Sequence, residues 1–129
     1  MNKLTGEITT VETEQNLALV RVKASGYGFY ALMPAPPQWL KPGAKVNILF
    51  KETEVIIAIP PINTSVRNQL PCEIAKIKTG AILCELTLNI ENETITSIIT
   101  RAACEALDLK EKMPVLALIK TNEISLTHD

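Results

Sequence analysis

The chain contains two diverged copies of one small module. Residues 4–34 align without gaps to residues 70–100, and Leu17, Val20 and Val22 lie over Leu83, Leu86 and Leu88. After a few extra residues in the second copy, Leu40-Lys41 matches Leu109-Lys110. Few identities survive, but the apolar pattern does, as expected of a duplicated structural unit. The alternative is that two β-rich stretches share alternating apolar residues by chance, and the long ungapped register favours duplication.

A linker separates the two copies. It lies near Pro60-Pro61-Ile62-Asn63-Thr64, where paired prolines cannot continue a central strand. A length of 129 residues suits one ordinary domain or two very small ones. The sequence therefore predicts two modules, residues 1–60 and 61–129.

Each module is predicted to be mainly strand. In the second copy Ile82, Cys84, Leu86 and Leu88 alternate onto one face, and residues 18–22 do the same in the first. Residues 46–50 and 115–119 read as fourth strands, and short final strands follow around 55–59 and 123–126. A helix is expected at residues 101–107 after the N-cap Thr100. Pro34, Pro36 and Pro37 limit its first-copy equivalent to a short turn of helix.

This order of elements predicts the fold class. The chain should be mainly β, with two OB-like five-stranded barrels in tandem. Each barrel should carry one short helix between its third and fourth strands.

Composition excludes several classes of function. The formal net charge is -1, so the chain lacks the long-range field of a general nucleic-acid binder. No stretch approaches the roughly 20 apolar residues of a membrane helix, and the start is not a signal peptide. We therefore expect a cytoplasmic protein that has no membrane or direct nucleic-acid partner. Three cysteines without C-x-x-C spacing favour reduced, buried thiols over disulfides or zinc ligands.

The residues show no catalytic constellation. We find no acid/base pair, no nucleophile beside a base and no Gly-rich phosphate loop, so the chain is not expected to be an enzyme. No residue is expected to bind a metal ion directly. His128 lies near a terminus that is expected to fray, and Trp39 is expected to pack over the turn that follows it.

Three features in the second half suggest an anion site. Residues 64–68 bring together hydroxyls, backbone N–H groups and the guanidinium of Arg67. The helix start after Thr100 offers N–H groups and a positive dipole end. Lys120, at the end of the fourth strand, adds a compact charge. Each feature alone also has a plain structural interpretation, as a linker, a helix cap or a surface lysine.

The segment Thr64-Ser65-Val66-Arg67-Asn68-Gln69-Leu70 resembles the Ser-Ala-Arg-Asn-Gln-Leu signature that opens molbindin (Mop, TOBE-type) domains. The resemblance continues through residues 74–81, 85–88, 96–100 and 118–121, and covers about residues 64–127. It implies an OB-like fold, a homo-oligomer, either dimer or trimer, and molybdate or tungstate bound between subunits.

The resemblance also implies which residues bind the oxoanion. The family's ligands map onto Ser65, Arg67, Thr100 and Lys120. A further family Ser maps onto Ala103, which retains only its backbone N–H as a donor. The first copy is degenerate, because Met1-Asn2-Lys3-Leu4 lacks the Ser and Arg and Pro34 replaces the Thr. Of the ligand positions, only Lys51 matches there.

The leading hypothesis is an intracellular molybdate- or tungstate-binding protein that stores, buffers or senses the anion. The alternative is the ligand-sensing part of a molybdate-responsive transcription regulator or of a molybdate-importer ATPase. A third hypothesis, an OB-fold nucleic-acid binder, is disfavoured because aromatic residues are few and the charge is balanced.

Overall fold

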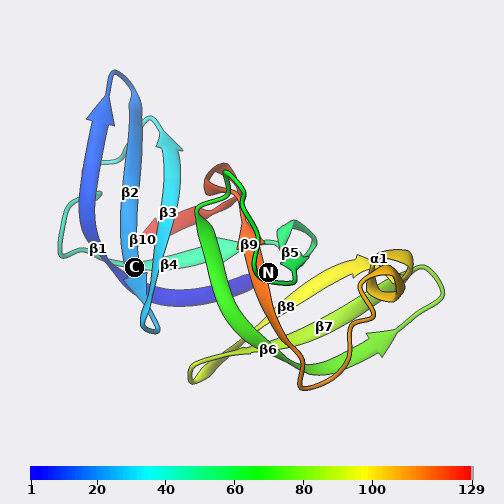
Figure 1. The fold of residues 1–129 in the computed structure, drawn as a ribbon. Coiled ribbons are helices and arrows are strands. Elements are labelled where there is room, and N and C mark those ends of the chain that lie inside the picture. The colour runs from blue at the N-terminus through cyan, green and yellow to red at the C-terminus, as the bar shows by residue number, and fades with distance from the viewer. Residues whose placement is uncertain (129) are drawn as a thin grey trace.

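Two curled five-stranded sheets lie side by side in the computed structural model, which describes residues 1–128 (Figure 1). The first contains β1 (Asn2–Glu14), β2 (Leu17–Ala24), β3 (Tyr27–Pro34), β4 (Lys45–Phe50) and β10 (Ser125–His128). The second contains β5 (Ile56–Ala58), β6 (Asn68–Thr79), β7 (Leu83–Ile90), β8 (Glu93–Thr100) and β9 (Pro114–Ile119). One α-helix, α1 (Arg101–Ala106), and two short 3-10 helices, η1 (Glu52–Glu54) and η2 (Thr121–Glu123), complete the described elements.

Alternating apolar residues fill the interior of each sheet, as the period-two pattern predicts. Ala18, Val20 and Val22 are fully buried in β2, and Leu86 and Leu88 are fully buried in β7. The prediction was wrong for Ile82, which is 75% exposed because it precedes the first residue of β7.

The two copies exchange their last strands. The strand order is β10-β4-β1-β2-β3 in one sheet and β5-β9-β6-β7-β8 in the other. The final strand of the first copy, β5, therefore pairs with β9 of the second copy, and β10 pairs with β4 of the first. The linker at residues 59–67 joins the two halves, but neither sheet is built from one half alone.

Two equivalent asparagines reinforce this exchange. Asn2 and Asn68 each lie two residues before the aligned Leu4 and Leu70. The Asn68 side chain accepts from the Tyr30 N–H at 2.7 Å and donates to the Tyr30 carbonyl at 2.9 Å. The Asn2 side chain makes the same pair of bonds to the Thr96 backbone, both at 2.8 Å. Each copy therefore binds the third strand of the other through a nearly buried amide.

The connection between the third and fourth strands differs between the copies. In the second copy it contains α1, as predicted. In the first, residues 35–44 form turns without a helix, because Pro36 and Pro37 disfavour helical backbone at the residue before each and Pro34 has no side-chain oxygen to cap a helix. This loop carries Trp39, whose ring stacks on His128 at 5.1 Å between centroids. The expectation that residue 128 would fray was wrong, because His128 belongs to β10 and pairs with Val46 of β4.

Candidate oxoanion site

The predicted N-cap of α1 forms as expected. Thr100 ends β8, and its hydroxyl oxygen accepts a hydrogen bond from the Ala103 N–H at 3.0 Å. The Arg101 N–H is also occupied, because it donates to the Ile82 carbonyl at 2.7 Å. The Ala103 N–H is therefore engaged within the turn, whereas the Thr100 hydroxyl keeps its own proton to donate outward.

Thr100 and Ala103 lie at the edge of an apolar groove of about 350 Å³. The other residues lining it belong to both copies: Thr53, Val55, Ile56, Ile57, Leu83, Ile98, Ile99 and Leu107. Because β5 is exchanged, η1 and β5 of the first copy form one wall. Ile56 and Leu83 remain 54% and 51% exposed, which leaves apolar area uncovered beside the helix start.

Ser65, Arg67 and Lys120 form a separate cluster. Asn68 pairs with Ile119 where β6 begins and β9 ends, so their neighbours Arg67 and Lys120 lie at the same end of this strand pair. The Arg67 guanidinium folds back on the linker, donating to the Thr64 carbonyl and, at 3.4 Å, to the Ser65 carbonyl. The following helix, η2, contacts β3 of the first copy.

The five predicted residues therefore divide into two groups within one chain. Thr100 and Ala103 face the first copy's η1 and β5, whereas Ser65, Arg67 and Lys120 lie toward its β3. None of the second group lines the groove at Thr100. Within residues 1–128, neither Arg67 nor Lys120 forms an ion pair, so no carboxylate neutralises either charge.

Lys51 is a position that the sequence alone did not place in the site. It directly precedes η1, whose Thr53 lines the groove with Thr100. In the repeat register Lys51 matches Lys120. Because η1 contacts β8, Lys51 directly precedes an element that packs on the strand ending at Thr100, although Lys51 itself does not line the groove. Only the pairing of the sheets could have shown this.

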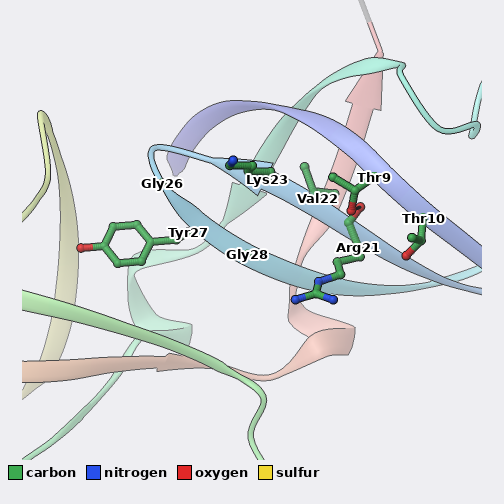
Figure 2. A pocket seen from close by; sticks show the side chains of 8 residues that line it. All are labelled: Thr9, Thr10, Arg21, Val22, Lys23, Gly26, Tyr27 and Gly28. Atoms are coloured by element: carbon green, nitrogen blue, oxygen red, sulfur yellow. Dashed lines mark hydrogen bonds between the residues drawn. The ribbon is translucent and has the colours of Figure 1, made fainter.

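A second groove, of about 410 Å³, lies on the first copy (Figure 2). Arg21 and Lys23 project from β2, Thr9 and Thr10 come from β1, and the Tyr27 ring extends away from them. The Arg21 guanidinium lies 5.3 Å from the centroid of the Tyr30 ring. Both cations are exposed, and none of the predicted anion-binding residues lines this groove.

Residues 1–128 offer neither a metal-binding cluster nor a membrane-spanning helix. No cluster of His, Cys, Asp and Glu there could hold a metal ion. No helix of that part of the chain is long and apolar enough to cross a membrane.

Comparison with known proteins places the chain in a family. The TOBE domain model matches residues 64–126. Molybdenum-pterin-binding protein 1 of Clostridium pasteurianum is 35% identical over 66 residues, which are 50% of this chain and 97% of that protein. The chain belongs to the molbindin (Mop) family of TOBE-domain proteins, and the expected family is confirmed.

Over nearly its whole length, the chain is similar to a solved structure of the cytoplasmic molybdate-binding protein ModG with molybdate bound. The two chains have a TM-score of 0.94 and 26% identity, and the match covers 99% of this chain and 96% of that one. This match confirms the predicted tandem of OB-like folds. The molybdenum-pterin-binding protein MopB of Rhodobacter capsulatus is 34% identical over 90 residues.

The chain spans only part of some relatives. It covers 33% of MopB, 24% of the import ATP-binding protein WtpC of Pyrococcus abyssi and 32% of the import ATP-binding protein ModC of Rhizobium etli.

Proposed function

We propose that this protein binds molybdate or tungstate as an intact oxoanion inside the cell, and so stores, buffers or senses it. The observation that carries the proposal is the similarity, over nearly the whole of both chains, to a cytoplasmic protein described with molybdate bound. The chemistry of the site supports a binding role, since its groups are hydrogen-bond donors and cations and not acid/base pairs.

The anion would be held by charge-assisted hydrogen bonds. Arg67 can donate two parallel N–H groups to a tetrahedral oxoanion, and Lys120 adds a compact charge. Ser65 and Thr100 contribute hydroxyl donors. Molybdate and tungstate are larger than sulfate, so a cavity that they fill would hold sulfate less well.

A second copy of the chain would complete each site. In one chain the Arg67 cluster and the Thr100 turn face different parts of the first copy, so neither has the full set of donors. The apolar groove beside Thr100 leaves Ile56 and Leu83 half exposed, which suits coverage by another subunit. Ligand at subunit interfaces is also what the molbindin resemblance implies.

Isothermal titration with molybdate, tungstate and sulfate tests this function. We expect tight binding of the first two and little heat from sulfate. Arg67→Ala removes the guanidinium and should weaken binding at least ~10-fold, since hydrogen bonds to charged groups contribute about 1.5–3 kcal/mol. Arg21→Ala, which removes an exposed arginine of the first copy, is the matched control and should bind as the parent does.

The result can also contradict the proposal. No heat with any oxoanion would mean that the family likeness extends to the fold only. Equal loss in Arg67→Ala and Arg21→Ala would place the site elsewhere. Light scattering on the same samples tests the interface, because a monomer that binds the anion with full affinity would exclude a site between subunits.

A second candidate function is the ligand-sensing part of a longer protein. It is favoured by the small share of WtpC and ModC that the chain covers. An immunoblot of cell extract would separate the two candidates, because a regulator or importer subunit would run well above 14.2 kDa.

A further inference from the structure

Two of the three cysteines share one cavity beside the helix start. Cys84 lies in β7 and Cys104 lies in α1, and both line a cavity of about 420 Å³ with Arg101, Glu105, Asp108 and Glu111. The Cys84 thiol is also one of the groups that raise the pKa of Cys104, as expected for side chains that are close together. Both are free, at 1% and 8% exposure. Two thiols that line one cavity need a modest shift of α1 toward β7 to reach the spacing of a disulfide.

The third cysteine provides an internal comparison. Cys72 lies in β6 and its thiol is directed to the Val115 carbonyl at 3.6 Å. It does not line the cavity of the other two. The first copy has Ala18 where the second has Cys84, and Ala18 is fully buried in the same strand position. Nothing in the module's packing therefore requires a thiol at this position.

We propose that Cys84 and Cys104 form a reversible intramolecular disulfide when the protein meets a peroxide, and that this bond lowers oxoanion affinity at the adjacent Thr100 turn. The second clause rests on the proposed function, whereas the first stands without it.

The chemistry balances with the peroxide as oxidant. Cys104, the more exposed thiol, loses its proton and its sulfur attacks one peroxide oxygen. The O–O bond breaks, and a sulfenic acid and one water form. The Cys84 sulfur then attacks the sulfenic sulfur, the S–O bond breaks and a second water leaves. Two thiols are oxidised by two electrons, and the peroxide is reduced to two waters.

The surroundings make this step slow. Burial, the neighbouring Cys84 thiol and nearby Glu105 together hold the pKa of Cys104 above its usual range. The thiol is therefore protonated at neutral pH, and the thiolate is the reactive form. We expect oxidation under sustained peroxide exposure and not on brief contact.

The disulfide would act on the site through α1. Cys104 directly follows Ala103, whose N–H holds the Thr100 hydroxyl. An S–S bond is about 2.05 Å long, much shorter than the contact distance of two thiols, so forming it draws α1 toward β7. The first turn and the outward Thr100 hydroxyl must shift with it.

The experiment oxidises the full chain with hydrogen peroxide. In the parent we expect titratable thiols in denaturant to fall from three to one, the mass to fall by two hydrogens, and dithiothreitol to reverse both changes. Cys84→Ala, which copies the first module, should lose this reaction. Cys72→Ala should keep it, with thiols falling from two to none. Molybdate affinity of the oxidised parent should fall ~10-fold and recover on reduction.

Each result decides one part. Added oxygen mass with no disulfide, or a disulfide between chains, would overturn the first clause. A disulfide that leaves molybdate affinity unchanged would overturn the second. If the reduced protein binds no oxoanion, the proposed function fails, but the thiol count still decides whether the disulfide forms.

Discussion

At the residue scale, position 103 separates this chain from the molbindin pattern that it otherwise resembles. The family commonly has a serine there, and this chain has alanine. The Ala103 N–H is already occupied by the Thr100 hydroxyl. The turn therefore offers an incoming anion the Thr100 O–H but no side-chain donor from residue 103.

Ala103→Ser should tighten molybdate binding by roughly 3–10-fold, since it adds one hydroxyl donor worth about 1 kcal/mol. Titration calorimetry measures the change. Ala102→Ser, at the exposed neighbouring position, is the control and should leave affinity as it was. Equal affinity in all three proteins would mean that residue 103 does not face the anion.

At the scale of elements, the exchange of β5 and β10 means that neither half of the chain can complete its own sheet by itself. Each half of the chain lacks the strand that completes its own sheet. A cut between residues 60 and 61 leaves β4 without β10 and β9 without β5. Unpaired strand edges favour association with any chain that supplies the missing strand.

Fragments 1–60 and 61–129, expressed together with a tag on one, should therefore copurify as a pair. Each supplies the other's missing strand, and the Asn2 and Asn68 amides bond across the cut. Gel filtration of the purified material measures the association. A shortened second-half fragment, 61–123, lacks β10 and should associate more weakly with fragment 1–60. Two fragments that elute as separate folded monomers would contradict this expectation.

Much of the local structure was predictable, because local patterns determine it. Thr100 as an N-cap followed by Ala-rich residues predicted α1, and buried Val20 and Leu86 follow from strand alternation. The exchange was not predictable, since a three-residue strand such as Ile56–Ala58 carries no information about its partner. For the same reason the sequence could not show that η1, which follows Lys51, packs on β8 of the second copy.

At the scale of the whole molecule, the two sheets should unfold together. Exchanged strands and the two asparagine amides tie each copy to the other, so one copy cannot open without removing part of its neighbour. Two local probes report on the two halves. Trp39 is the only tryptophan and belongs to the first copy, whereas the Cys84 and Cys104 thiols belong to the second.

Leu86→Ala creates a cavity in the second sheet, where Leu86 is fully buried. It should destabilise the protein by about 2–5 kcal/mol. In a urea titration, the midpoint of the transition seen by Trp39 fluorescence and the midpoint seen by thiol exposure should fall by the same amount. Leu17→Ala, at a 40% exposed position in the first sheet, is the control and should shift neither probe strongly. If only the midpoint of the thiol-exposure transition fell, the two halves would unfold independently.

The exchange of final strands also bears on how a duplicated gene is maintained. A copy that served only to contact an anion could be deleted once its Ser, Arg and Thr had been replaced. Here the first copy still provides β5, the Asn2 amide and one wall of the groove at Thr100. Purifying selection on folding is then enough to retain it, and its former ligand positions are free to drift while the second copy remains under constraint for the anion.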